Sequence, residues 1–229
     1  MANFYEAGSG VLRRLYDVQV QTPPVLDRQR YFPGHADFEA EWRSIRAECL
    51  ARMDVMGSIP EFHDIMAEQA ELSKHGGRFW RLFVLRAYGA DHRANLAQCP
   101  VLRRLLQAHP EVTSAAFSIL EGGKHIPAHR GPFRGILRYH LPLVIPPPLM
   151  GQASNRLRVD SASYALEEGR GILWDDTYEH EAWNDSAAPR AVLLLDVFRP
   201  GLSWPLRVLS HGIVGGVGLA WRFSGGARR

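Results

Sequence analysis

Lysine is almost missing from this chain of 229 residues, which has only Lys74 and Lys124 although its net charge is +3. Nearly all the positive charge is therefore arginine. Arginine suits fixed contacts with carboxylates and phosphates, although arginine-rich usage is equally typical of a GC-rich genome. The arginines form no stripe interleaved with aromatic residues, and this argues against a nucleic-acid-binding protein.

Cysteine and long apolar runs are scarce as well. Cys49 and Cys99 lie far apart without CxxC spacing, which argues against a disulfide framework or a structural zinc site and is compatible with a reducing cytoplasm. The most apolar stretch, Gly212 to Trp221, is shorter than the roughly 18 residues needed to cross a bilayer. The first residues lack a basic segment followed by an apolar run, so no signal peptide is expected. These features predict a cytoplasmic protein.

The remaining composition is that of a globular protein, with 46% hydrophobic and 22% charged residues. The length allows one sizeable core. Residues 1 to about 35 are predicted to form an extended arm, with turns at residues 21–24 and at Pro33-Gly34. Apolar residues then recur at helical spacing, which predicts three helices, at about Phe38 to Met53, Pro60 to Lys74 and Pro100 to His109.

Short segments of strand composition, separated by turn residues, follow Pro110. They are Thr113 to Leu120, Gly135 to Ile145, Asn155 to Asp160, Gly171 to Trp174 and Arg190 to Phe198. Closely spaced short strands favour a sandwich, jelly roll or barrel. The sequence therefore predicts a single α+β domain, mainly β, with a helical region 1–110, a β core 111–200 and a C-terminal tail 201–229.

Two of these strands carry polar residues on one face. Side chains alternate along a strand, so Arg138 and His140 share a face of the segment Gly135 to Ile145. Arg190 opens the last strand, and Asp196 follows on its face. Charged groups on a buried strand face are costly unless they meet a ligand or a partner. An arginine at the mouth of a barrel can form a bidentate pair with a carboxylate.

Two histidines lie in turn-rich segments beside these strands, His129 in IPAHRGP and His180 in DDTYEHE. Neutral imidazole is the commonest metal ligand and suits iron(II). Any one of the ten histidines is more often structural or exposed than a ligand, so the pair alone does not establish a metal site.

Three segments together carry a family resemblance: FSILEGGKHIPAHRGPFRGILRYHLPLVIP, WDDTYEHEAWND and PRAVLLLDVFRP, all within residues 117–200. They resemble the aspartyl/asparaginyl β-hydroxylase family of iron(II)- and 2-oxoglutarate-dependent oxygenases. The resemblance implies a double-stranded β-helix core of the jelly-roll or cupin-like kind. It also implies that His129 and His180 hold Fe(II), that Arg190 pairs with the distal carboxylate of 2-oxoglutarate, and that Ser118, Arg138 and His140 complete the co-substrate pocket. Dioxygen would be the second co-substrate.

The third ligand of such iron sites is commonly an acid two residues after the first histidine. Here that position is Gly131, and the family is similar in lacking this carboxylate, with water in its place. His35-Ala36-Asp37 matches the usual text but precedes a predicted helix away from the β core, so we interpret it as a chance match. The four acids around His180, each of which could orient a ligating imidazole or lie in a solvated turn, are Asp175, Asp176, Glu179 and Glu181.

The substrate is less well indicated than the chemistry. The family name implies the β-carbon of an aspartyl or asparaginyl residue, or a related small molecule, and this reading is slightly preferred. Family members also include bacterial hydroxylases of lipid A acyl chains, which Ile59 to His63 and Phe79 to Gly89 resemble more loosely. Those enzymes look anchored to the membrane, and no such anchor is read here. A non-catalytic, metal-binding cupin-like barrel is the alternative from another class, although it gives no reason to aim Arg138, His140 and Arg190 inward.

The C-terminal tail allows two interpretations. Its tryptophans and arginines, from Trp204 to Arg229, could contact the inner membrane peripherally. Packing over the barrel or at an oligomer face is preferred, because the glycines at 215, 216 and 218 would weaken an amphipathic helix.

Overall fold

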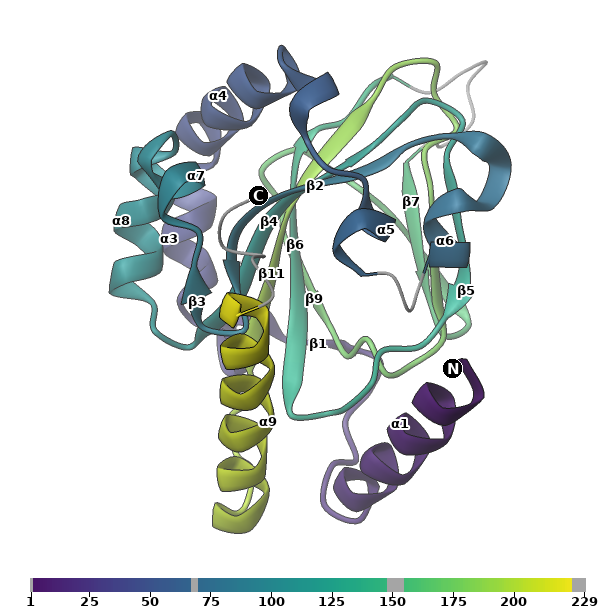
Figure 1. Cartoon of the computed structure of the whole chain (residues 1–229), viewed down its shortest axis with the longest axis vertical. Helices are drawn as coiled ribbons and strands as arrows, with labels where there is room; N and C mark the ends of the chain where they lie inside the picture. The colour runs from purple at the N-terminus through teal and green to yellow at the C-terminus, as the bar shows by residue number, and fades with distance from the viewer. Residues whose placement is uncertain (1, 67–69, 148–154, 224–229) are drawn as a thin grey trace.

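The computed structural model describes residues 2–66, 70–147 and 155–223, with the backbone alone for residues 2–9. These residues form two antiparallel β-sheets, with helices packed mainly against the larger one (Figure 1). The fold class predicted from the sequence, mainly β with helices from the N-terminal region, is confirmed.

The larger sheet has seven strands in the order β1-β9-β6-β11-β4-β2-β3. They are β1 (Val25–Leu26), β2 (Trp80–Ala87), β3 (Ala90–Asp91), β4 (Val112–Leu120), β6 (Ile136–Val144), β9 (Ile172–Trp174) and β11 (Arg190–Phe198). The smaller sheet has the order β5-β10-β7-β8, with β5 (His125–His129), β7 (Arg156–Val159), β8 (Ala162–Ala165) and β10 (His180–Trp183). From β4 to β11 the chain passes back and forth between the two sheets, which is the double-stranded β-helix that the resemblance implies.

Helices cover the outer face of the larger sheet (Figure 1). They are α2 (Arg28–Tyr31), α3 (His35–Ala40), α4 (Trp42–Met53), α7 (Arg93–Ala97) and α8 (Pro100–Ala108). Their apolar residues pack with the odd-numbered side chains of β6, including Tyr139 and Leu141, and with Phe117 and Leu195 of the neighbouring strands. The even-numbered side chains of β6 therefore face the space between the sheets, as the alternation predicted.

The register places the polar residues of the larger sheet on this inner face. Asp196 of β11 lies opposite Arg138 of β6, and Arg138 lies opposite Trp174 of β9. Val192 lies opposite Ser118 of β4. Directly paired residues in antiparallel strands share a face, so these side chains all point into the barrel.

The first 110 residues contain more structure than predicted. Residues predicted to form an extended arm include helix α1 (Ala2–Asp17), and the predicted helix from Phe38 is divided at Glu41 into α3 and α4. The segment from Pro60 to Lys74 forms two short helices, α5 (Phe62–Ile65) and α6 (Ala70–Lys74), with residues 67–69 outside the described part. It is preceded by a 3-10 turn, Met56–Ser58, and followed by another, His75–Gly77.

Several strands were missed. β2 lies in the region predicted to be helical, and its pairing with β4 makes it part of the larger sheet. β5 and β10 were interpreted as turn-rich segments, but they pair with each other in the smaller sheet. Pro127 is tolerated in β5 because β5 is the edge strand of the smaller sheet, where a missing backbone N–H is least costly.

The tail forms α9 (Trp204–Phe223), although its glycines were expected to weaken a helix. A Cβ at position 218 would lie 2.2 Å from the backbone oxygen of Tyr88, so Gly218 allows the helix to approach the turn between β2 and β3 closely. Val214 and Ser210 are buried on the same side. Tertiary packing thus outweighs the propensity of the glycines. No helix within the described residues is both long and apolar enough to cross a bilayer.

Candidate active site

His129 and His180 form the centre of the candidate site. His129 ends β5, His180 begins β10, and the two residues lie directly opposite each other in the ladder. Their ring centroids are 4.0 Å apart. Each Nδ1 lies within hydrogen-bonding distance of a backbone carbonyl two residues earlier, 2.8 Å from Pro127 O and 2.9 Å from Tyr178 O. With Nδ1–H donating to these carbonyls, each ring has its Nε2 lone pair available for a ligand.

Burial keeps both imidazoles neutral. It lowers the pKa of His129 to about 4, and it lowers the pKa of His180 well below the usual value, with the neighbouring His129 adding to the effect. Metal ligation requires the neutral ring, so both histidines are already in the competent form at pH 7. Two fixed, neutral imidazoles with available Nε2 atoms fit a divalent transition metal.

Asp176 occupies the space beside Gly131, where a third ligand would commonly be. A Cβ at Gly131 would lie 2.3 Å from Asp176 Cγ, so the carboxylate fills the volume that a side chain at 131 would need. Asp176 is 2% exposed, and its Oδ1 has no hydrogen-bond partner among the described residues. The sequence left four acids equivalent, and the only signal for Asp176 was its position four residues before His180. The fold distinguishes Asp176 from the other three acids, because it places the Asp176 carboxylate beside Gly131.

Arg138 holds this carboxylate together with Asp196. Arg138 Nη1 lies 3.3 Å from Asp176 Oδ2, and its Nε and Nη2 donate to Asp196 at 2.8 and 3.2 Å. Burial raises the pKa of Asp176 to about 7, with the Arg138 guanidinium opposing the shift. Burial alone would lower the pKa of Arg138, but Asp196 and Asp176 together raise it above its usual value. The predicted inward-facing Arg138 is therefore paired with two acids.

The three other acids have separate partners. Glu179 and Glu181 both pair with Arg158 on the smaller sheet, and Glu181 also lies 3.0 Å from His125. Asp175 is fully buried and contributes to the network described next. These contacts favour a structural function for Glu179 and Glu181.

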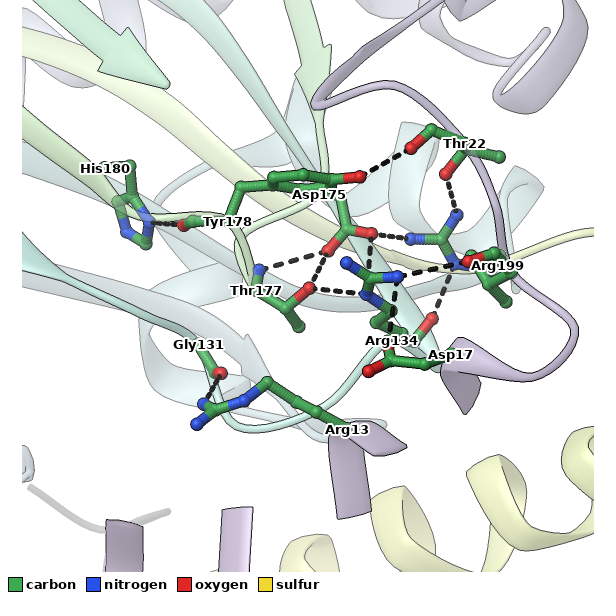
Figure 2. A network of polar contacts seen from close by, with 11 residues as sticks. Arg13, Asp17, Thr22, Gly131, Arg134, Asp175, Thr177, Tyr178, His180 and Arg199 are labelled. Carbon is green, nitrogen blue, oxygen red and sulfur yellow. Dashed lines mark hydrogen bonds and ion pairs between the residues drawn. The ribbon is translucent and has the colours of Figure 1, made fainter. Parts of the chain in front are cut away.

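Figure 2 shows how Asp175 fixes the loop that carries His180. Its Oδ1 accepts hydrogen bonds from the backbone N and the hydroxyl of Thr177, at 3.0 and 2.6 Å. Its Oδ2 forms a buried ion pair with Arg199. The loop then places the Tyr178 carbonyl that accepts from His180. Asp175 therefore orients the imidazole indirectly, through the backbone of the loop.

Helix α1 is attached to the same region (Figure 2). Arg134 donates to Thr177 Oγ1 at 2.9 Å and forms an ion pair with Asp17 at 3.1 Å. Arg13 donates to Gly131 O at 2.9 Å. These contacts connect α1 to the loop that follows His129 and, through Arg134, to the loop that precedes His180.

The remaining predicted site residues lie deeper in the barrel and do not line the open pocket beside the two histidines. Arg190 is 4% exposed, and its Nε and Nη1 have no partner among the described residues. His140 Nε2 is likewise unpartnered, and burial together with Arg138 and Arg190 lowers the pKa of His140 well below its usual value. Ser118 Oγ accepts from Trp80 Nε1 at 3.0 Å.

His140 is connected to the histidine pair through Trp174, and Arg190 lies close enough to His140 to influence its pKa. The Trp174 ring makes edge contacts with both His180 and His140, at centroid distances of 4.5 and 5.5 Å. Burial lowers the pKa of Arg190 to about 10, so its guanidinium is still charged at neutral pH. A buried cation with free N–H groups is costly unless an anion satisfies it. A carboxylate fits this position chemically.

The open pocket beside the histidines is mainly apolar. It has a volume of about 150 Å³ and includes His129, His180, Arg138 and Asp176 at its polar side. The apolar lining comes from α5, β2, β4 and β11, and includes Phe62, Met66, Trp80, Leu82, Val84, Ala115, Ala116 and Leu194. Within the described residues, no group of three or more His, Cys, Asp and Glu side chains is arranged to hold a metal ion.

His35 lies elsewhere. It is buried on α3, with Nδ1 2.7 Å from Phe32 O and its ring beside Phe32 and Tyr139 on the outer face of the larger sheet. Asp37 pairs with His109 at 2.9 Å. The HxD motif therefore lies on the opposite side of the larger sheet from His129 and His180.

We expect Gly131→Ala to destabilise the protein by about 1–3 kcal/mol, because the added methyl group would overlap the buried Asp176 carboxylate. Thermal unfolding measures this effect. Gly57→Ala is the control, since a Cβ there meets nothing within 4 Å. Adding Asp176→Ala to Gly131→Ala should recover part of the packing loss. Wild-type stability of the single variant would contradict the close contact.

The fold is a double-stranded β-helix in which two neutral histidines lie opposite each other on neighbouring strands. The sequence profile of the family described as Aspartyl/Asparaginyl beta-hydroxylase matches residues 39–200, and the chain belongs to this family. The family resemblance predicted from the three motifs is thus confirmed.

Individual relatives agree with this assignment. The chain is 38% identical over 192 residues to an ornithine lipid ester-linked acyl 2-hydroxylase of Rhizobium tropici, which covers 84% of this chain and 66% of the relative. It is 31% identical over 170 residues to human aspartyl/asparaginyl beta-hydroxylase, and this match covers 72% of the present chain and 21% of the human protein. The chain therefore spans about two thirds of the bacterial relative and about a fifth of the human one. A Pseudomonas putida prolyl-4-hydroxylase structure covers 71% of this chain and 88% of its own, with 17% identity and a TM-score of 0.43.

Proposed function

We propose that this protein is an iron(II)- and 2-oxoglutarate-dependent dioxygenase that hydroxylates an unactivated C–H bond of an aliphatic acyl chain. The main supporting observation is the combination of two neighbouring neutral histidines, of which His129 is half-buried and His180 buried, with a buried Arg190 whose Nε and Nη1 have no partner among the described residues. Iron and 2-oxoglutarate supply a matching pair, since the metal takes imidazole and the arginine takes a carboxylate.

The surroundings of each residue support a distinct role for it in this proposal. His129 and His180 would hold the iron through Nε2, because both Nδ1 atoms face backbone carbonyls. Arg190 would bind the distal carboxylate of 2-oxoglutarate, and Ser118 and His140 would donate or accept hydrogen bonds beside it. Bound iron, with 2-oxoglutarate and dioxygen, would supply the oxidation that converts C–H to C–OH, with succinate and carbon dioxide as co-products.

Asp176 and Arg138 have a positioning function in this proposal. The carboxylate lies beside Gly131, so it could accept a hydrogen bond from a water molecule held by bound iron. Arg138 and Asp196 keep it in place. The largely apolar lining limits water at the reacting carbon.

The substrate class is inferred from the pocket. Side chains such as Phe62, Leu82 and Leu194 form an apolar surface that ends at the histidine pair. An aliphatic chain would bind there because each Å² of apolar surface removed from water contributes about 25 cal/mol of favourable free energy. The bacterial relative is named for acyl 2-hydroxylation, which agrees with this choice. The pocket therefore reverses the slight preference for an aspartyl or asparaginyl residue.

An aspartyl side chain of a peptide is the second candidate. Arg130 is exposed and lines the same pocket, so it could pair with an acidic group at the mouth. The human relative is named for aspartyl and asparaginyl β-hydroxylation.

Succinate formation tests the proposal. The purified protein with iron(II), ascorbate and 2-oxoglutarate is supplied with detergent-dispersed acyl lipids or with acidic peptides, and the product is examined for a mass gain of one oxygen. Stimulation by lipid supports the acyl substrate, whereas stimulation by peptide alone supports the second candidate. No 2-oxoglutarate binding by metal-loaded, folded protein would overturn the dioxygenase itself.

We expect Ala116→Phe to reduce turnover of a long acyl substrate at least about tenfold, because a ring at this position would fill the apolar pocket next to Leu194. Binding of 2-oxoglutarate should be unchanged, since Ala116 is distant in register from Arg190. Ala94→Phe, at an exposed position on α7, is the matched control. Undiminished turnover by a folded Ala116→Phe variant would exclude this pocket as the acyl site.

A further inference from the structure

We propose that α1 and α9 form a docking surface for an anionic lipid bilayer, beside the mouth of the apolar pocket. The observation behind it is the distribution of exposed apolar side chains. Ten large hydrophobic residues of the described part are exposed, and eight of them belong to α1, the residue that follows it, and α9. These eight are Val11, Leu15, Val18, Trp204, Val208, Val217, Leu219 and Phe223.

On α9 the most exposed side chains share one face. At 100° per residue, Trp204, Val208, Leu219 and Phe223 lie within an arc of about 100°. Trp204 is 68% exposed and Phe223 is 84% exposed. The opposite face is buried through Ser210, Val214 and Gly218, as argued above. The helix therefore packs on the protein along one side and presents a separate apolar stripe to the outside.

The charged residues of α9 are both arginines. α9 contains no acidic residue, and Arg207 and Arg222 are both exposed on it. On α1, Arg14 is exposed, whereas Asp17 is paired with Arg134. Exposed tryptophan and phenylalanine beside arginine are typical of helices that lie at the surface of an anionic bilayer.

The two helices belong to one surface. Tyr16 of α1 lies 2.8 Å from Ser210 of α9, oxygen to oxygen, and its ring makes an edge contact with Phe133. Tyr16, Phe133 and Val214 are buried in one apolar cluster with neighbouring residues of both helices. Figure 1 shows the two helices projecting from the same end of the barrel. They can therefore contact a flat surface together.

This surface adjoins the pocket. Arg13 of α1 donates to the Gly131 carbonyl, and Gly131 lines the pocket. Gly218 of α9 packs against Tyr88, which also lines it. A bilayer bound by α1 and α9 would thus lie close to the rim through which a substrate reaches His129 and His180. The docking proposal goes beyond the proposed function, because it holds for any substrate.

A second copy of the chain is the competing occupant. A stable interface buries about 800 Å² on each partner, with side chains packed in its centre. The centre of the α9 stripe instead consists of Gly212, Gly215 and Gly216, which supply little apolar surface. Separate aromatic groups at the two ends suit insertion between lipids better than packing on a matching helix.

Vesicle flotation tests the proposal with the full chain, in the absence of metal and 2-oxoglutarate. We expect the protein to float with vesicles of phosphatidylethanolamine and phosphatidylglycerol, and at least about tenfold less with neutral phosphatidylcholine. Trp204→Ser combined with Phe223→Ser should lower binding to the anionic vesicles at least about tenfold. Val55→Ser combined with Phe79→Ser, at the two exposed apolar positions outside this surface, should leave it unchanged.

A charge-reversal variant covers the case in which the serine variant loses the α9 helix. Arg207→Glu combined with Arg222→Glu keeps the apolar stripe and should also abolish flotation, with helicity checked by circular dichroism. Wild-type protein that does not float would overturn the proposal, as would equal flotation of the charge-reversed variant. A dimer that the serine variant dissociates, without vesicle binding, would identify the surface as an interface between copies.

The outcome is separable from that of the proposed function. Activity on detergent-dispersed lipid needs no docking surface, so activity without flotation would reject only the bilayer. Flotation without any 2-oxoglutarate binding would reject only the dioxygenase.

Discussion

The His180→Ala variant is expected to lose iron(II) binding and all 2-oxoglutarate-dependent succinate formation, and the His129→Ala variant is expected to do the same. Each ring would supply one of only two protein ligands, so either substitution would leave the metal with a single imidazole. Anaerobic calorimetry with manganese(II) as a redox-silent substitute measures the binding, and succinate measures turnover.

The His35→Ala variant is the control for the two substitutions that are expected to abolish metal binding. His35→Ala removes a buried histidine from the HxD text, but its ring contacts Phe32 and Tyr139 on the other side of the larger sheet. This variant should bind metal as the wild type does, even where its stability is reduced. Retained turnover in either His129→Ala or His180→Ala would remove the metal assignment, and a loss in His35→Ala would move the site to α3.

The β core was predictable because its strands carry a period-two pattern with buried apolar residues on one side. In β6, Tyr139 and Leu141 pack under the helices, while Arg138 and His140 point inward, as their alternation indicated. The same reasoning placed Arg190 and Asp196 of β11 on the inner face. Such local alternation can be read from a single segment.

The parts that were missed depend on distant contacts. β5 and β10 are short and contain turn-forming residues, so only their pairing across His129 and His180 defines them as strands. α9 is stabilised by Gly218 against Tyr88, a contact that no local pattern reveals. Likewise, Asp176 became distinct from its three acidic neighbours only when the fold placed it over Gly131. Propensity describes a segment alone, whereas these features are set by tertiary packing.

Replacing Arg190 with methionine is expected to have two opposite effects. The apparent requirement for 2-oxoglutarate should rise at least about tenfold, because truncating one partner of a buried charged pair costs several kcal/mol. The ligand-free protein should become more stable, by about 1–4 kcal/mol, because a buried cation whose Nε and Nη1 have no partner is replaced by an apolar chain of similar length. Calorimetric titration of metal-loaded protein measures the first effect, and thermal unfolding without ligands measures the second.

The combination distinguishes a binding arginine from a structural one. An arginine that supported the fold would lower stability when replaced, and an unchanged 2-oxoglutarate requirement would remove its proposed role. Arg190→Lys keeps the charge but loses the planar, bidentate donor, so it should recover only part of the affinity. A wild-type protein that binds metal but never 2-oxoglutarate would instead favour the non-catalytic, metal-binding barrel. Under the proposed function, the instability that Arg190 introduces into the empty barrel is relieved when the co-substrate carboxylate binds.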